Sequence, residues 1–164
     1  MAKKAAYMGM FTALAFVFSY LEFLIPINLG IPGVKLGLAN LVTIVVLYLM
    51  GVKEACILSF VRIVLNGFTF GNPAAMLYSL AGGFLSLLAM ALSRKFKLFS
   101  VTGVSVLGGV FHNLGQILAA VLVVENAKLL YYLPVLVLSG TIAGTVIGIL
   151  AAMVIKRLDK GMEY

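Results

Sequence analysis

The sequence predicts an all-α membrane protein: a bundle of six transmembrane helices with both chain termini in the cytoplasm. Of the 164 residues, 63% are hydrophobic and only 10% are charged, against roughly 45–50% and 25% in soluble domains. The apolar residues fall into six segments, and lysine and arginine gather in alternate breaks between them. No linker interrupts this pattern, so we expect a single domain over residues 1–164.

Each predicted span follows from an apolar segment that can cross a bilayer core of ~30 Å, or nearly so, as a helix. A signal peptide is an alternative for the first segment, but its apolar run of about 20 residues exceeds the ~7–15 of a signal core. The second and third segments are short, and we expect inner or tilted helices there. The predicted spans are residues 5–25, 36–50, 55–68, 74–92, 101–124 and 133–155.

Turn-forming or charged residues mark every break between these spans. The breaks read, in order, PINLGIPGVK, MGVKE, NGFTFGNP, SRKFKLFS and ENAKLLYYLP. The first of them, residues 26–35, contains two prolines and two glycines. We expect it to lie over the outer end of the bundle as a lid.

The basic residues set the orientation, because cytoplasmic loops retain lysine and arginine. With the N-terminus inside, two of these residues fall outside, Lys35 and Lys128. Nine fall inside: Lys3, Lys4, Lys53, Arg94, Lys95, Lys97, Lys156, Arg157 and Lys160. The asymmetry predicts a multi-pass protein of the cell membrane. It also explains the net charge of +7 without nucleic acid, since the basic residues are spread over four membrane-edge segments and form no single patch.

The polar side chains within the spans all lie at mid-depth or in the outer half, apart from hydroxyls, Tyr48 and Cys56. Residues three and four apart share a helix face, so Arg62 with Asn66 and His112 with Gln116 form two polar faces. A charge at the bilayer centre costs on the order of 3 kcal/mol, and Arg62 should therefore face the interior.

This pattern predicts a pocket that opens to the outside. Arg62 would bind an anionic group of the ligand, because guanidinium forks suit carboxylates and phosphates. Hydrogen bonds would come from Asn66, His112, Asn113 and Gln116, and the rim would be formed by Asn40, Asn72 and Tyr78.

Each of these residues also has a structural interpretation. Asn, Gln and His join membrane helices through hydrogen bonds worth roughly 0.6–2 kcal/mol. Arg62 has an ion-pair partner in Glu22, the only carboxylate within the spans. Asn72 precedes Pro73, an arrangement that caps helices, and Tyr78 has the position of an interfacial aromatic.

Small residues recur at every fourth position in the first and last spans, where they let helices approach closely. They are Ala5, Gly9 and Ala13 in the first span, and Gly140, Gly144, Gly148 and Ala152 in the last. For the last span we expect packing within the bundle. For the first, a partner protein is nearly as good an explanation, because Lys3 and Lys4 flank the stripe at the membrane edge.

Two absences bear on chemistry. The chain has no GxxxxGK[ST] phosphate loop, so it would need a partner to power transport with ATP. Its one aspartate, Asp159, cannot form the carboxylate clusters that hold magnesium on diphosphates. We therefore expect a protein that is not an enzyme, with no metal and no cofactor.

Four stretches together resemble a known family: GVKLGLANLVTIVVLYLMG, FVRIVLNGFTFGNPAAMLYSLAGGFLSLLAM, GVSVLGGVFHNLGQILAA and YYLPVLVLSGTIAGTVIGIL. From about Gly33 to Leu150 the chain is similar to the Gx transporter family, also labelled heptaprenyl diphosphate synthase component I. That family in turn resembles the substrate-binding S components of energy-coupling factor (ECF) transporters.

The resemblance implies an S-component-like six-helix bundle with an outward-facing pocket. It also implies that the stripe Ala5, Gly9 and Ala13 docks on a transmembrane coupling subunit driven by two ATPases, with Gly9 in place of the usual central alanine. We therefore predict a substrate-binding subunit for uptake of a small organic solute. An accessory membrane component of isoprenoid, quinone or electron-transfer metabolism is the alternative. A carrier that works alone and is driven by protons or ions ranks last. Such a carrier normally has titratable groups along the path of the ion, and the inner halves of the predicted spans have none.

Overall fold

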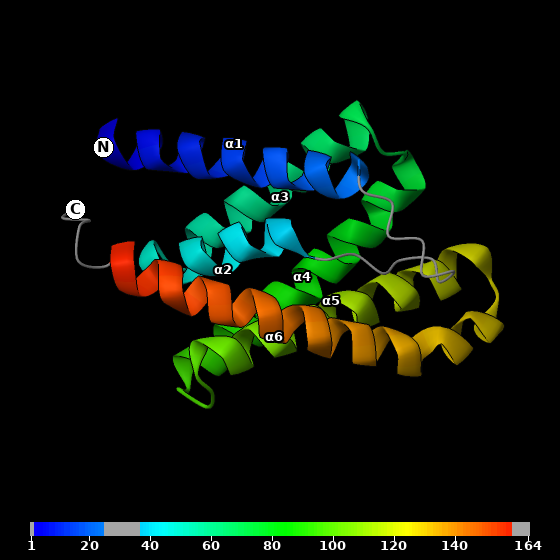
Figure 1. Cartoon of the computed structure of the whole chain (residues 1–164). Helices are drawn as coiled ribbons and strands as arrows, with labels where there is room; N and C mark the ends of the chain where they lie inside the picture. The colour runs from blue at the N-terminus through cyan, green and yellow to red at the C-terminus, as the bar shows by residue number, and fades with distance from the viewer. Residues whose placement is uncertain (1, 25–36, 159–164) are drawn as a thin grey trace.

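The computed structural model of the chain describes residues 2–24 and 37–158. These residues form six α-helices and one 3-10 helix: α1 (Ala2–Leu24), α2 (Leu38–Leu49), α3 (Val52–Thr69), α4 (Pro73–Lys95), α5 (Val101–Val124), η1 (Ala127–Tyr132) and α6 (Leu133–Leu158). The all-α prediction is confirmed, with a helix at each predicted span (Figure 1). The predicted lid, residues 26–35, lies outside the described residues.

Four helical stretches are long and apolar enough to cross a membrane: α1, α4, α5 and the combined run of η1 and α6. Helix α2 has 12 residues, and α3 carries the charged side chains Lys53, Glu54 and Arg62. The outer surface is apolar as well, since Phe68, Phe84 and Leu122 are each more than 70% exposed. Large exposed apolar side chains around a partly polar interior are the arrangement that lipid requires.

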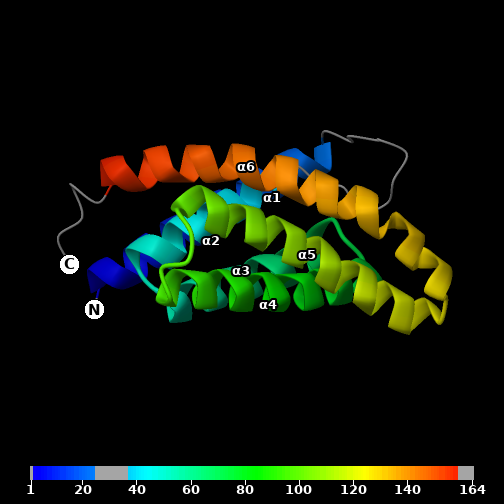
Figure 2. The same cartoon turned by 90° about the horizontal axis from the view of Figure 1, so that it is seen from below.

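The helices pack as a ring. Helix α1 contacts α2 and α3, and the chain of contacts continues from α3 through α4, α5 and α6 back to α2. Figure 2 shows α4, α5 and α6 side by side, and both views place the start of α1 and the end of α6 at the same end of the bundle. We call this the inner end.

Glycines bring α4, α5 and α6 into backbone contact. A Cβ atom on Gly109 of α5 would lie 2.5 Å from the carbonyl oxygen of Gly140 on α6, and one on Gly115 would lie 2.8 Å from the Cα of Gly82 on α4. Gly144 faces the α5 backbone in the same way, 2.7 Å from the Cα of Val106. The small-residue stripe of the last span therefore packs inside the bundle, as predicted.

The stripe on α1 has the opposite environment. Ala5, Gly9 and Ala13 are exposed, and a Cβ atom on Gly9 would meet no described atom within 4 Å. Helix α1 instead packs on the bundle through Phe11 and Ala15. Internal packing is therefore the wrong explanation for this stripe, which faces away from the described helices.

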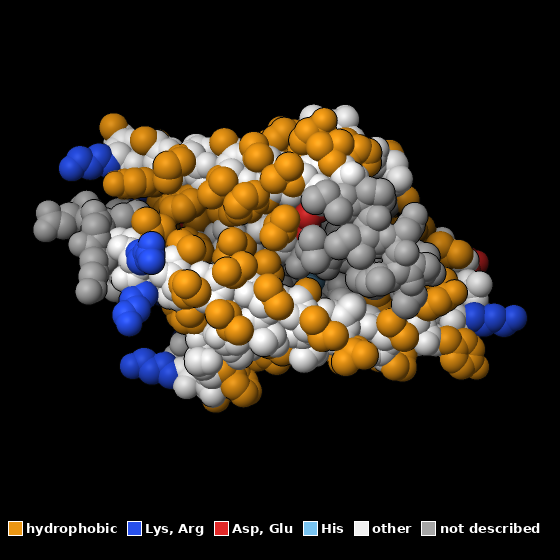
Figure 3. All heavy atoms as spheres, viewed as in Figure 1, with side chains coloured by type: hydrophobic (Ala, Val, Ile, Leu, Met, Phe, Trp, Pro, Cys, Tyr) orange, Lys and Arg blue, Asp and Glu red, His pale blue; other side chains and the backbone are white. Residues whose placement is uncertain are grey.

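Basic side chains gather at the inner end (Figure 3), as the orientation argument requires. There Arg94 of α4 donates hydrogen bonds to the carbonyl oxygens of Leu47 and Tyr48 at the end of α2, where helix carbonyls lack intrahelical partners. Lys4 of α1 forms an ion pair with Glu54 of α3 at 2.5 Å. Arg94 and Lys4 therefore each join two helices at the inner end.

Candidate functional site

A cavity of about 440 Å³ lies within the ring, and every α-helix contributes to its wall. This volume is within the range of small-molecule sites, ≈ 300–1,000 Å³. Seven of the eight residues predicted to bind or border a ligand line it together: Asn40, Arg62, Asn66, Asn72, His112, Asn113 and Gln116. The eighth, Tyr78, does not.

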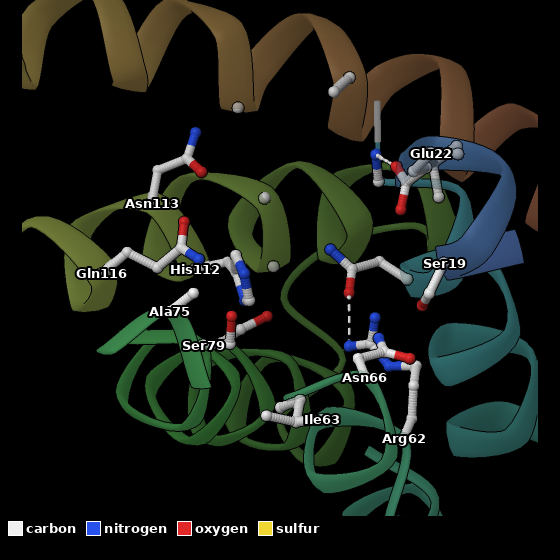
Figure 4. Close-up of a pocket in the computed structure, with 18 of the residues that line it drawn as sticks. Ser19, Glu22, Arg62, Ile63, Asn66, Ala75, Ser79, His112, Asn113 and Gln116 are labelled. Atoms are coloured by element: carbon white, nitrogen blue, oxygen red, sulfur yellow. Dashed lines mark hydrogen bonds between the residues drawn. The ribbon is translucent and has the colours of Figure 1, made fainter. Parts of the chain in front are cut away.

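Close contacts between helices place Arg62 of α3 and His112 of α5 at one depth. On α4, a Cβ atom at Gly83 would meet Ile63 of α3 at 2.9 Å, and one at Gly82 would meet the carbonyl oxygen of His112 on α5 at 2.6 Å. Arg62, next to Ile63, is therefore level with His112. Figure 4 shows the α3 residues Arg62 and Asn66 across the cavity from the α5 residues.

Arg62 carries the positive charge of this cavity. Arg62 is only 8% exposed, and its one hydrogen bond to another described residue runs from Nη2 to Oδ1 of Asn40 on α2, at 3.4 Å. Nε has no hydrogen-bond partner in the described chain. The predicted alternative, an ion pair with Glu22 that holds α1 on α3, is not formed. The guanidinium is therefore buried with one long bond to a neutral amide.

Glu22 is engaged elsewhere on the cavity wall. Its Oε1 accepts hydrogen bonds from the backbone amides of Gly37, at 2.5 Å, and Leu38, at 2.9 Å, where α2 begins (Figure 4). A carboxylate is stabilised at a helix N-terminus by the free amides and the helix dipole. Glu22 thereby fastens the outer end of α1 to α2, which explains why it does not pair with Arg62.

Several polar groups on the wall have no partner in the described chain. The Oδ1 atom of Asn66, one turn outward from Arg62, is buried without a hydrogen bond. Gln116 of α5 and Ser79 of α4 also line the cavity, and no hydrogen bond to another described residue satisfies them. Together with Arg62 they offer donors and acceptors to a bound molecule at the middle and outer levels.

Two of the predicted residues have the structural role that was their alternative. Asn113 donates from Nδ2 to the carbonyl oxygen of Leu136, at 2.7 Å, and to Oγ of Ser139, at 3.4 Å, joining α5 to α6. Asn72 caps α4 by accepting a hydrogen bond from the amide of Ala75 at 2.7 Å. Both also line the cavity, so they shape its wall from fixed positions.

Tyr78 was predicted to form part of the cavity rim, but it does not line the cavity. Successive helix positions are about 100° apart, and on α4 it is Ser79, not Tyr78, that faces the cavity. Sequence reasoning also missed Ser19, Ser86 and Ser105 on the wall. The seven-residue spacing of Ser79 and Ser86 was a signal for a shared face, but a serine within a span is weak evidence because its hydroxyl often bonds its own helix.

Aromatic rings close the outer part of the cavity next to α1. Phe70, at the end of α3, contacts Phe16, Tyr20 and Phe23 of α1, with ring centroids 5.2–5.8 Å apart. Phe23 and Phe70 both line the cavity. This cluster gives the site an apolar wall beside its polar one.

Comparison with known protein families yields a match over most of the chain. The family model described as heptaprenyl diphosphate synthase component I matches residues 11–154 of the chain. No curated protein and no solved structure matches it. Among residues 2–24 and 37–158, no group of three or more His, Cys, Asp or Glu side chains is placed to hold a metal ion.

Proposed function

The chain belongs to the heptaprenyl diphosphate synthase component I family, and we propose that it is a non-catalytic subunit of the cell membrane that binds a small organic anion in the cavity. The ligand would enter from the outer side, and a partner ATP-driven module of the ECF type would complete its uptake. This is the role that the resemblance to S components implies.

The observation that carries this proposal is that the guanidinium of Arg62 is buried without forming an ion pair with any described residue. A buried charge without a counter-ion costs several kcal/mol, and proteins normally supply a paired carboxylate. Here the carboxylate of Glu22 acts on Arg62 electrostatically from a distance but forms no ion pair with it, because Glu22 is bonded to the α2 N-terminus. The hydrogen-bond partner of Arg62 is a neutral amide. An anionic ligand in the adjoining cavity would restore the balance.

The other polar residues of the cavity wall would then orient the bound ligand through hydrogen bonds. Asn66 lies one turn outward from Arg62, and Gln116 and Ser79 extend the polar wall on α5 and α4. Such groups fix a ligand by hydrogen bonds, while Phe23 and Phe70 contact its apolar part. The amide that joins α5 to α6, Asn113, would act by holding the wall in place.

The exposed stripe of small residues on α1 supports the proposal of a partner subunit. Three small residues, Ala5, Gly9 and Ala13, form an outward face on which another helix can pack closely. We propose that the transmembrane coupling subunit docks there, at the inner half of α1.

Mass spectrometry of small molecules that co-purify with the protein tests the binding role. We expect an anionic compound with the wild type and its loss with Arg62→Met. Arg94→Met is the matched control, because Arg94 lies outside the cavity wall and caps α2. It should keep the compound, although it should lower stability.

Stability separates a binding role from a purely structural one. Replacing buried ion pairs by apolar side chains of similar volume is often neutral or stabilising, by about 1–4 kcal/mol, and the same direction is expected for a buried charge that has no ion-pair partner. We expect the ligand-free Arg62→Met protein to be at least as stable as the wild type. If the variant unfolds more easily and the wild type carries no anion, the polar core is structural and the proposal is wrong.

The family description favours a second candidate, an accessory component of a heptaprenyl diphosphate synthase. It would place a diphosphate, also an anion, near Arg62. Proteins captured with the chain in mild detergent decide between the two: ATPases with a membrane coupling subunit favour uptake, and a soluble prenyl synthase subunit favours the accessory role.

A further inference from the structure

We infer that the cavity contains a second recognition point at its inner end, formed by the hydroxyl groups of Ser86 on α4 and Ser105 on α5. It would bind a neutral hydrogen-bonding group, such as a hydroxyl or a carbonyl, at the far end of an elongated anionic ligand. The inference rests on the proposed function, since the anionic end of that ligand is the one bound at Arg62.

The two serines differ from the other buried serines and threonines of the described helices because they both line the cavity and make no hydrogen bond to another described residue. Ser59 and Ser93 are also buried and unbonded within this part of the chain, but they do not line the cavity. Ser86 is 4% exposed and Ser105 is 6% exposed, and both line the cavity. A serine or threonine within a helix commonly bonds the carbonyl four residues earlier, as Ser19 and Thr43 do here. Ser86 and Ser105 make no hydrogen bond within the described chain.

An unsatisfied buried hydroxyl is costly, about 1–3 kcal/mol. Neither serine oxygen is sealed by packing, in contrast to Oδ1 of Asn66. The space that they reach is the cavity that they line. The two hydroxyls are therefore available to a molecule that extends inward from the level of Arg62.

Their depth follows from the helix positions. Ser86 lies one turn inward from Gly82, which packs against His112, and Ser105 lies two turns inward from His112 itself. At ~1.5 Å per residue these offsets are about 6 and 10 Å along the helix axes. The recognition point is therefore well separated from Arg62.

The wall between the two levels has no charge. Only Glu22 and Arg62 are charged among the described residues that line the cavity, and both lie at or outward of the Arg62 level. Met90, Gly108 and Ile44 line the cavity inward of this level, from the neighbouring turns of α4, α5 and α2. Met90 fills the groove over Gly108, where a Cβ atom would lie 2.6 Å from its sulfur. An apolar, slender segment fits here, and a second charged group does not.

Two matched probes test this arrangement: octanoate, and 8-hydroxyoctanoate, which adds one terminal hydroxyl. Binding is measured on the protein in lipid nanodiscs, with empty nanodiscs subtracted. We expect the wild type to prefer the hydroxylated probe by about tenfold, as one or two hydrogen bonds imply. The double variant Ser86→Ala/Ser105→Ala should bind both probes equally, with its octanoate affinity unchanged.

Ser93→Ala is the matched control, because Ser93 is also a buried serine of α4 but does not line the cavity. It should retain the preference. The double variant should remain folded, since it removes hydroxyls that bond nothing. If it does not fold, each single variant should lose part of the preference.

The outcomes separate the two proposals. Equal binding of the probes by the wild type, no binding of either probe, or a preference that survives in the double variant would each overturn the inner recognition point. Retention of octanoate binding by Arg62→Met would instead contradict the proposed function. If octanoate binds through Arg62 but the hydroxyl adds nothing, only the inference of this subsection is wrong.

Discussion

Arg62 and Glu22 illustrate how much a single position reveals before its surroundings are known. That Arg62 would be buried and near Asn66 follows from its depth and from helix periodicity, and the structure bears this out. The hydrogen-bond partners of Glu22 could not be inferred from the sequence in the same way. Its hydrogen bonds go to the amides of Gly37 and Leu38, and only the packing of α1 against α2 brings them within reach.

The bonds of Glu22 predict a graded response to substitution. Glu22→Ala should lower the free energy of unfolding by about 2 kcal/mol, because hydrogen bonds to charged groups contribute about 1.5–3 kcal/mol. Glu22→Gln keeps an acceptor but loses the charge at the helix dipole, and should cost about half as much. Unfolding in denaturant, followed by circular dichroism in detergent, measures both.

Glu54→Gln provides the comparison for Glu22. Glu54 pairs with Lys4, which is largely exposed. Loss of this ion pair should therefore lower the free energy of unfolding by less than about 1 kcal/mol. Equal losses for the alanine and glutamine variants of Glu22 would show that its charge at the α2 N-terminus is immaterial.

At the scale of helices, two similar stripes have different surroundings. Both were visible in the sequence as small residues four apart. Their partners were not, because spacing shows which residues share a face but not what covers that face. The same limit explains Tyr78. It lies in the predicted helix, but the direction in which α4 turns toward the cavity depends on Gly82 and Gly83, which fit against α5 and α3.

The contrast between Gly9 and Gly140 is testable with one substitution in each. Gly9→Leu should change the free energy of unfolding by less than about 0.5 kcal/mol, since its side chain enters open space. It should nevertheless abolish capture of the proposed membrane partner. Gly140→Leu should destabilise by about 3 kcal/mol, at the upper end of the usual cost of overpacking, because its side chain would overlap the α5 backbone. Thermal unfolding and pull-down from membranes provide the two readouts.

Normal capture of the partner by a folded Gly9→Leu protein would remove the docking role of α1. The ligand cavity would be unaffected by that result, because Gly9 does not line it.

For the whole molecule, hydropathy and charge predicted the membrane class and six helices, since both depend on sums over many residues. The complete polar lining of the cavity could not be predicted without the fold, because it combines serines and amides from helices far apart in the sequence. Ser86 and Ser105 belong to different helices, and neither is conspicuous alone.

Orientation in the membrane is a prediction at this scale. In a Cys56→Ser background, a cysteine in place of Ala127 should react with a membrane-impermeant maleimide on intact cells. A cysteine in place of Leu98, in the basic turn between α4 and α5, should react only after lysis. Both positions are exposed, so accessibility within the protein does not bias the result. The reverse pattern would invert the topology.

The glycine contacts among α4, α5 and α6 also determine how the molecule can deform. Where backbones touch, a helix can neither slide nor tilt without overlap, so these three helices behave as a stiff slab. The described glycines place no such backbone contact on α1. This helix is held by side chains instead: by Phe11 and Ala15 along its middle, and by Lys4, Glu22 and the rings around Phe70 toward its ends. We therefore expect a motion that widens the cavity to occur between α1 and its neighbours more readily than among α4, α5 and α6.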